Sequence, residues 1–133
     1  MTNREIYDSA LRLVCETDQL DANGDYEERA TYLIPLICHR YASLDRHYRS
    51  VNGLKAQEIL QINCFPLTTV FPLADAFAPA VTAALAGLLV MDENAEMSQK
   101  LSALSDRMIE EIKTELQVVT PYQLESIASR YVF

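Results

Sequence analysis

The sequence lacks tryptophan and is poor in glycine, with three glycines in 133 residues. An all-β fold reverses direction many times and needs more turn residues than this. Three cysteines, at positions 15, 38 and 64, are odd in number and too widely spaced for a disulfide framework or a zinc-ligand pair. These shortages argue against β and disulfide-rich folds and predict reduced thiols in a cytoplasmic protein.

Positive charge and long apolar runs are also scarce. Eleven Lys and Arg oppose nineteen Asp and Glu, and the net charge of −8 repels nucleic acid and anionic lipid. The longest charge-free run, between Asp75 and Asp92, is shorter than a bilayer span and contains Pro79. Residues 1–5 begin no apolar signal segment. We therefore expect no membrane partner and no secretion.

What the sequence does have is helical periodicity. Half of the residues are apolar, which is enough for a core, and we predict one all-α domain over residues 1–133, a small bundle of about five helices. Thr2 and Glu5 form a capping box before the first helix. A second helix is expected from Asp25 to about Asn52-Gly53, with a kink or a split near Pro35 because proline removes one backbone hydrogen bond.

The stretch from Leu54 to Leu73 is the least regular. We predict a short helix over about 54–60 and then an extended arm over about 62–73, which contains two prolines and β-favouring residues. Phe65 and Phe71 are expected to be exposed on this arm, where they could reach another subunit.

The charge-free run from Ala76 to Met91 predicts a buried helix, with Pro79 tolerated in its first turn. Small residues around all its faces let neighbouring helices approach closely, which suits the centre of a bundle. After the Asp92-Glu93-Asn94 break, apolar spacing predicts an amphipathic helix over Met97–Leu116. Thr120-Pro121 predicts the start of a separate last helix that runs to about Tyr131.

Known catalytic and cofactor signatures are missing, and we predict neither enzyme activity nor a cofactor. No Gly-rich phosphate loop, G-x-S-x-G or H-E-x-x-H is present. His39 and His47 have no ligand set beside them, so helix side chains are the better interpretation than a metal site. The Asp21–Asp25 stretch resembles a calcium loop but lacks its final Glu, so a turn and helix cap explains it better.

One stretch reverses the acidic balance. Residues His39 to Lys55 have a local charge of +3 and include Tyr41 and Tyr48. Nucleic-acid contact is one interpretation, but both tyrosines fall on the predicted core stripe. A contact between this basic stretch and the acidic face of an identical neighbour is the other, and such contacts close into rings. The candidate interface residues are Phe65, Leu67, Val70, Phe71, Arg46 and Arg49.

The stretch from Phe71-Pro72-Leu73 through Leu88–Glu93 and the Met97–Leu116 helix resembles the head-to-tail adaptor proteins, or connectors, of tailed bacteriophages and prophages. The shared features are a proline just before an Ala-rich apolar helix, an acidic segment that ends this helix, and an amphipathic helix after it. It implies a non-enzymatic ring subunit that binds a portal-like protein and copies of itself, with double-stranded DNA only as passing cargo. Such a protein would be cytoplasmic during assembly and then part of the virion.

The alternative is a small cytoplasmic helical protein-binding or regulatory module of a bacterium. The composition fits either function, because both need a stable helical core and a charged surface.

Overall fold

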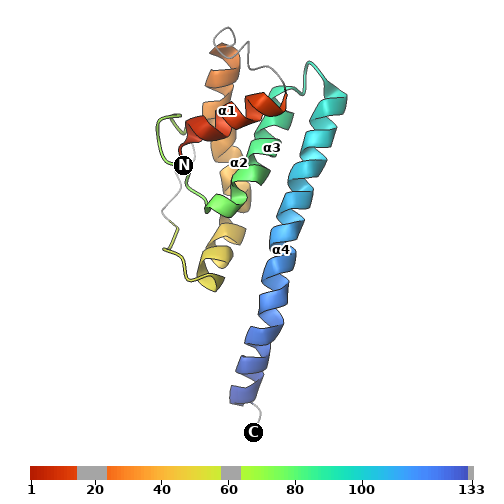
Figure 1. The fold of residues 1–133 in the computed structure, drawn as a ribbon. Helices are drawn as coiled ribbons and strands as arrows, with labels where there is room; N and C mark the ends of the chain where they lie inside the picture. Colours follow the sequence, from red (N-terminus) through yellow and green to blue (C-terminus); the bar gives the residue numbers. More distant parts are fainter. Residues whose placement is uncertain (15–23, 58–63, 132–133) are drawn as a thin grey trace.

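Four α-helices form the framework of the described part of the chain in the computed structural model (Figure 1). The structure describes residues 1–14, 24–57 and 64–131, with side chains as far as Leu116. The helices are α1 (Asn3–Leu13), α2 (Gly24–Val51), α3 (Ala78–Leu89) and α4 (Ala95–Tyr131), and a 3-10 turn, η2 (Asp75–Phe77), leads into α3. Those ranges contain no strand, only an isolated antiparallel bridge between Thr2 and Val70. The all-α prediction is confirmed.

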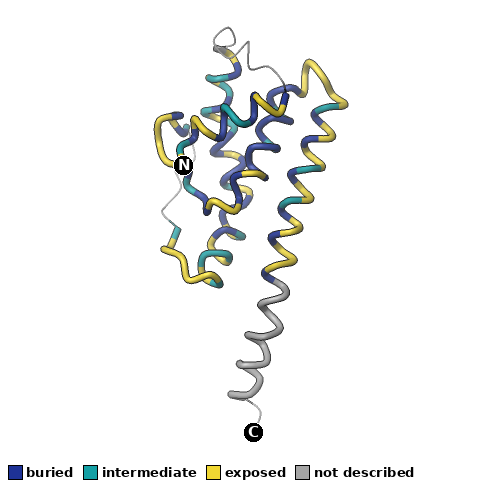
Figure 2. The backbone as a smooth tube through the Cα atoms, viewed as in Figure 1, coloured by how far each residue is buried: buried dark blue, intermediate teal, exposed yellow. Residues whose placement is uncertain are grey.

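Helix α3 is the centre of the bundle. It contacts α1, α2 and α4, and nine of its twelve residues are buried. Figure 2 shows this burial as a nearly continuous dark tube between the two longer helices. A helix with no charged side chain is stable there because most of its surface meets protein rather than water. The prediction of a central charge-free helix is confirmed.

Small residues bring α3 and α4 into close contact. A Cβ atom on Gly87 would lie 3.2 Å from the backbone oxygen of Ser98, so only glycine fits without a shift. The Ser98 hydroxyl donates to the Gly87 carbonyl at 2.7 Å, and the Ser105 hydroxyl donates to the Ala80 carbonyl at 2.8 Å. These two buried hydrogen bonds fix how far α4 can slide along α3.

Several helix ends follow the capping signals in the sequence. The Thr2 hydroxyl accepts the Glu5 N–H, and the Asn94 side chain accepts the Met97 N–H at 3.0 Å. After α2, Gly53 takes a positive φ of 65°, and the Leu54 N–H returns to the Arg49 carbonyl at 2.9 Å. This is the Schellman arrangement, in which glycine avoids a Cβ clash.

Helix α2 runs through Pro35, so the predicted split there is wrong, while the alternative of a kink stays a prediction. Helix α4 continues through position 121 to Tyr131, so the prediction of a separate last helix is also wrong. The predicted short helix at 54–60 is also not found where it is described: residues 54–57 are not helical, and 58–60 lie outside the described residues. The described part therefore has four α-helices rather than about five.

Residues 64–74, called the strap below, lie against the bundle. Pro35 has no N–H, so the Thr31 carbonyl lacks its helical donor, and the Phe65 N–H donates to it at 2.9 Å. The first turn of α1 likewise leaves free donors, and Asn3 N–H and Arg4 N–H bond the carbonyls of Thr69 and Leu67 at 3.0 and 2.8 Å. The strap thus satisfies backbone groups that the helices leave open.

Candidate interaction surfaces

Three of the six predicted interface residues are part of the core. The rings of Phe65 and Phe71 and the side chain of Leu67 are 4–8% exposed, so the expectation that the phenylalanines are available to another subunit is wrong. The reason is the docking of the strap, which turns alternate apolar residues inward. Val70 points the other way and is 72% exposed.

The two predicted arginines behave differently from each other. Arg46 is exposed and makes one long hydrogen bond, 3.4 Å, to Gln57. Arg49 is largely buried and uses its guanidinium within the chain: Nε bonds Asp45 at 2.9 Å, while the Nη atoms bond the carbonyls of Lys55 and Pro72 at 3.0 Å. Of the basic pair, Arg46 remains on the surface for a partner.

Asp45, Arg49 and Gln57 form a buried polar cluster that we call the clasp. The Asp45 carboxylate is fully buried and accepts three hydrogen bonds, from Arg49 Nε, from Gln57 Nε2 at 2.6 Å and from the Ala74 N–H at 2.8 Å. A buried carboxylate needs such partners because its desolvation is costly. The clasp joins the last turns of α2 to the loop that follows it and to the end of the strap.

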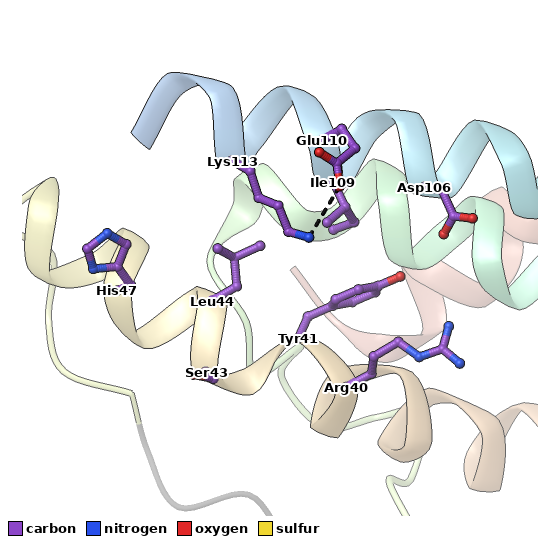
Figure 3. A pocket seen from close by; sticks show the side chains of 9 residues that line it. All are labelled: Arg40, Tyr41, Ser43, Leu44, His47, Asp106, Ile109, Glu110 and Lys113. Atoms are coloured by element: carbon purple, nitrogen blue, oxygen red, sulfur yellow. Dashed lines mark hydrogen bonds and ion pairs between the residues drawn. The ribbon is translucent and has the colours of Figure 1, made fainter. Parts of the chain in front are cut away.

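An open polar groove of about 730 Å³ lies between α2 and α4 (Figure 3). Arg40, Ser43 and His47 line it from α2, and Asp106 and Lys113 line it from α4, with Lys113 paired to Glu110 at 3.2 Å. Figure 3 shows Tyr41 and Ile109 reaching toward each other between the helices. Charges of both signs on the two walls suit a polar partner better than an apolar ligand.

The polar groove continues into an apolar one, because Arg40, Tyr41 and Asp106 line both. The apolar part, of about 320 Å³, is lined from α2, α3 and α4. Leu36 and Met91, which are 62% and 49% exposed, stand at its edge. Large apolar side chains grouped at a groove are a common mark of a protein contact.

A separate groove of about 400 Å³ lies on the other flank of α4, between α1, α3 and α4. Its apolar lining includes Met1 and Leu13, which are 52% and 42% exposed, and Met108. Its charged lining residues are Glu5 and Asp75, with no Lys or Arg. We call it the acidic groove.

Two buried groups have displaced pKa values. Burial, helped by the charge of Asp45, raises the pKa of the Cys38 thiol to about 12. Burial, helped by Glu27, raises the pKa of the Tyr7 hydroxyl to about 12. Both groups are neutral at physiological pH and lie within the core, so they serve packing rather than acid–base chemistry.

The predicted core position of Tyr41 is confirmed: it is 8% exposed. Tyr48 is half-buried, and its ring packs edge-on against Phe77 with 5.7 Å between the centroids. Most of the Tyr41 surface and part of the Tyr48 surface are therefore covered by protein, which disfavours their stacking on a base. Within the described residues, no group of three or more His, Cys, Asp or Glu is arranged to hold a metal ion. None of the described helices is long and apolar enough to cross a membrane.

The sequence reasoning missed the clasp and both flanks of α4. Asp45 and Arg49 are four residues apart, a spacing that predicts an ion pair on one helix face. Burial of the pair depends on the strap, which no local spacing reveals. The acidic groove combines residues from α1, η2, α3 and α4, so it exists only in the folded chain.

Comparison of the chain with protein-family models, with curated proteins and with solved structures gives no match. The residues of this chain and their arrangement are therefore the only indication of its function.

Proposed function

We propose that this chain is a non-enzymatic structural subunit of a phage or prophage head–tail connector, which binds a portal-like protein and neighbouring copies of itself. The observation that carries the proposal is the position of the stretch that resembles the connectors. From Phe71 to Leu116 it forms the strap end, η2, the central helix α3 and the described side chains of α4. The remaining helices pack around it.

The mode of attachment of α4 supports a role in assembly. Helix α4 is joined to the body mainly through α3, and it leaves an open groove on each flank. A rod held along one face by close packing and buried hydrogen bonds is a stiff element that can present the same surfaces in every copy.

Binding to a portal ring tests the proposal directly. The chain would be mixed with the portal protein of the phage or prophage that encodes it, and the mixture examined by size-exclusion chromatography and negative-stain microscopy. We expect co-elution and added density at one end of the portal ring. The portal ring alone is the control.

Failure to co-elute with the portal at both low and physiological ionic strength would contradict the connector function. Recovery of a stable complex with a bacterial regulatory protein instead would favour the alternative of a small cytoplasmic binding module.

A further inference from the structure

Exposed large hydrophobic side chains on the described surface gather mainly on the two flanks of α4. Two of the seven, Met1 and Leu13, line the acidic groove. Two others, Leu36 and Met91, line the apolar groove, and Tyr32 lies one turn before Leu36 on α2, in another surface pocket beside the strap. The chain thus carries two separate apolar surfaces, and each costs free energy while it faces water.

The first surface, the acidic groove, has an excess of negative charge. Glu5 and Asp75 stand at its rim, and Glu111 and Glu115 continue the stripe of α4 that holds Leu104 and Met108, at spacings of three and four residues. None of these four carboxylates has an ion pair within the described residues, and the two on α4 are exposed. Among the described residues, Glu5 and Asp75 are the only charged side chains that line the groove, although the Met1 amino group also lies there and exposed Arg107 follows Leu104 on α4.

The second surface is a ridge on α2, which we define as Tyr32, Leu36, Arg40, Ser43 and His47. All five are exposed, and their spacings of four, four, three and four residues place them on one stripe of the helix. Its first half is apolar, with Tyr32 54% and Leu36 62% exposed. Arg40 follows, and it has no ion pair within the described part of the chain.

We infer that the α2 ridge of one copy packs into the acidic groove of the next copy. A helical ridge with two apolar side chains meets an apolar groove, and the unpaired Arg40 meets the unpaired carboxylates of Glu5 and Asp75. This inference rests on the self-association in the proposed function and names the two surfaces that make it.

The geometry makes the contact head-to-tail. Leu104 and Met108 lie on the side of α4 that lines the acidic groove. Asp106 and Glu110 lie on another side of α4, which faces the α2 ridge of the same copy. Because the two surfaces are different and each copy has both, every copy can bind one neighbour on each side. Such contacts build a closed ring if the rotation from each copy to the next adds up to a full turn, and a filament if it does not.

Charge reversal on each side, alone and combined, tests the inference. The variants are Arg40→Glu, the double variant Glu5→Lys/Asp75→Lys, and the triple variant that combines them. Sedimentation velocity at low ionic strength, over a wide concentration range, measures the average mass. We expect the wild type to exceed the monomer mass of 15.0 kDa. Either reversal alone weakens association at least tenfold, and the triple variant restores it.

A matched control separates this contact from a general effect of net charge. Asp92→Lys/Glu93→Lys makes the same change in charge as the groove variant, at exposed positions outside both surfaces. It leaves association within a few-fold of the wild type. Far-ultraviolet circular dichroism checks that every variant is folded, which we expect because the substituted side chains lie at the surface.

A wild type that stays at its monomer mass at all concentrations overturns the inference. The acidic groove would then be a binding site for a basic helix of another protein. Single reversals that associate like the wild type, or a triple variant that stays dissociated, overturn it as well. A monomeric wild type that still co-elutes with the portal would refute this contact and keep the connector proposal.

Discussion

Replacement of Asp45 by Asn removes the charge at the centre of the clasp and almost none of its volume. The carboxylate accepts the Ala74 N–H on Oδ1 and the donors of Arg49 and Gln57 on Oδ2. In asparagine one of these two positions is an NH2 group. Whichever way the amide turns, a donor faces a donor, so at least one buried hydrogen bond is lost and another loses its ionic character.

The expected loss of stability is large. Each hydrogen bond to a charged group contributes about 1.5–3 kcal/mol, and removal of one member of a buried ion pair costs about 3–5 kcal/mol. The Arg49 side chain is only 17% exposed, so water cannot fully replace its partner. Against a typical stability of about 5–15 kcal/mol, we expect Asp45→Asn to lose about 3–5 kcal/mol and on the order of 10–20 °C in melting temperature.

Urea unfolding followed by circular dichroism measures this loss, with the linear extrapolation to water. Asp106→Asn is the matched control, because Asp106 is exposed and makes no hydrogen bond or ion pair in the described structure, and we expect it to change stability by less than about 0.5 kcal/mol. If Asp45→Asn costs less than about 1 kcal/mol, the clasp does not stabilise the fold as we argue.

Three further outcomes follow from the core. Gly87→Leu forces a side chain against the Ser98 carbonyl, and we expect urea unfolding to show a loss of about 1–3 kcal/mol or more. Because the pKa of Cys38 is about 12 and the thiol is buried, iodoacetamide at pH 8 modifies Cys38 only after the chain unfolds; rapid modification of the native protein would contradict this. The folded pKa of Tyr7, about 12, lies above its ordinary value near 10, so the stability contributed by the buried neutral phenol is fully present below pH 10. Between pH 10 and 12 the unfolded chain loses a proton that the folded chain keeps, and stability falls. Tyr7→Phe loses less stability over that range in pH-dependent melting, and equal losses would refute the assignment.

The central helix could be predicted from sequence because its evidence is local. A charge-free run with a proline in its first turn and small residues on every side is expected to form a helix that is buried at the centre of a bundle, because its apolar surface is unfavourable in water. The helix ends at Thr2, Gly53 and Asn94 could be predicted for the same reason, because a helix cap depends only on residues within about one turn.

The strap could not be predicted in the same way. Phe65 and Phe71 sit in a stretch with prolines and no helical spacing, and such a stretch gives no sign of which face is buried. Their burial depends on carbonyls and N–H groups that α1 and α2 leave free, 34 or more residues away in the sequence. For the candidate interface, sequence identified a basic stretch but could not tell Arg49, held inside the clasp, from exposed Arg46.

The hydrogen bond from the Phe65 N–H to the Thr31 carbonyl also reports whether the strap is docked on α2. Helix α2 can form by itself, but at Pro35 it carries one acceptor that no residue of α2 can fill. The amide proton of Phe65, in the strap, is protected only while the strap is in place, whereas the amides inside α2 are protected by the hydrogen bonds of the helix itself. Hydrogen exchange at this one amide therefore measures the opening of the strap separately from the unfolding of the helix beneath it.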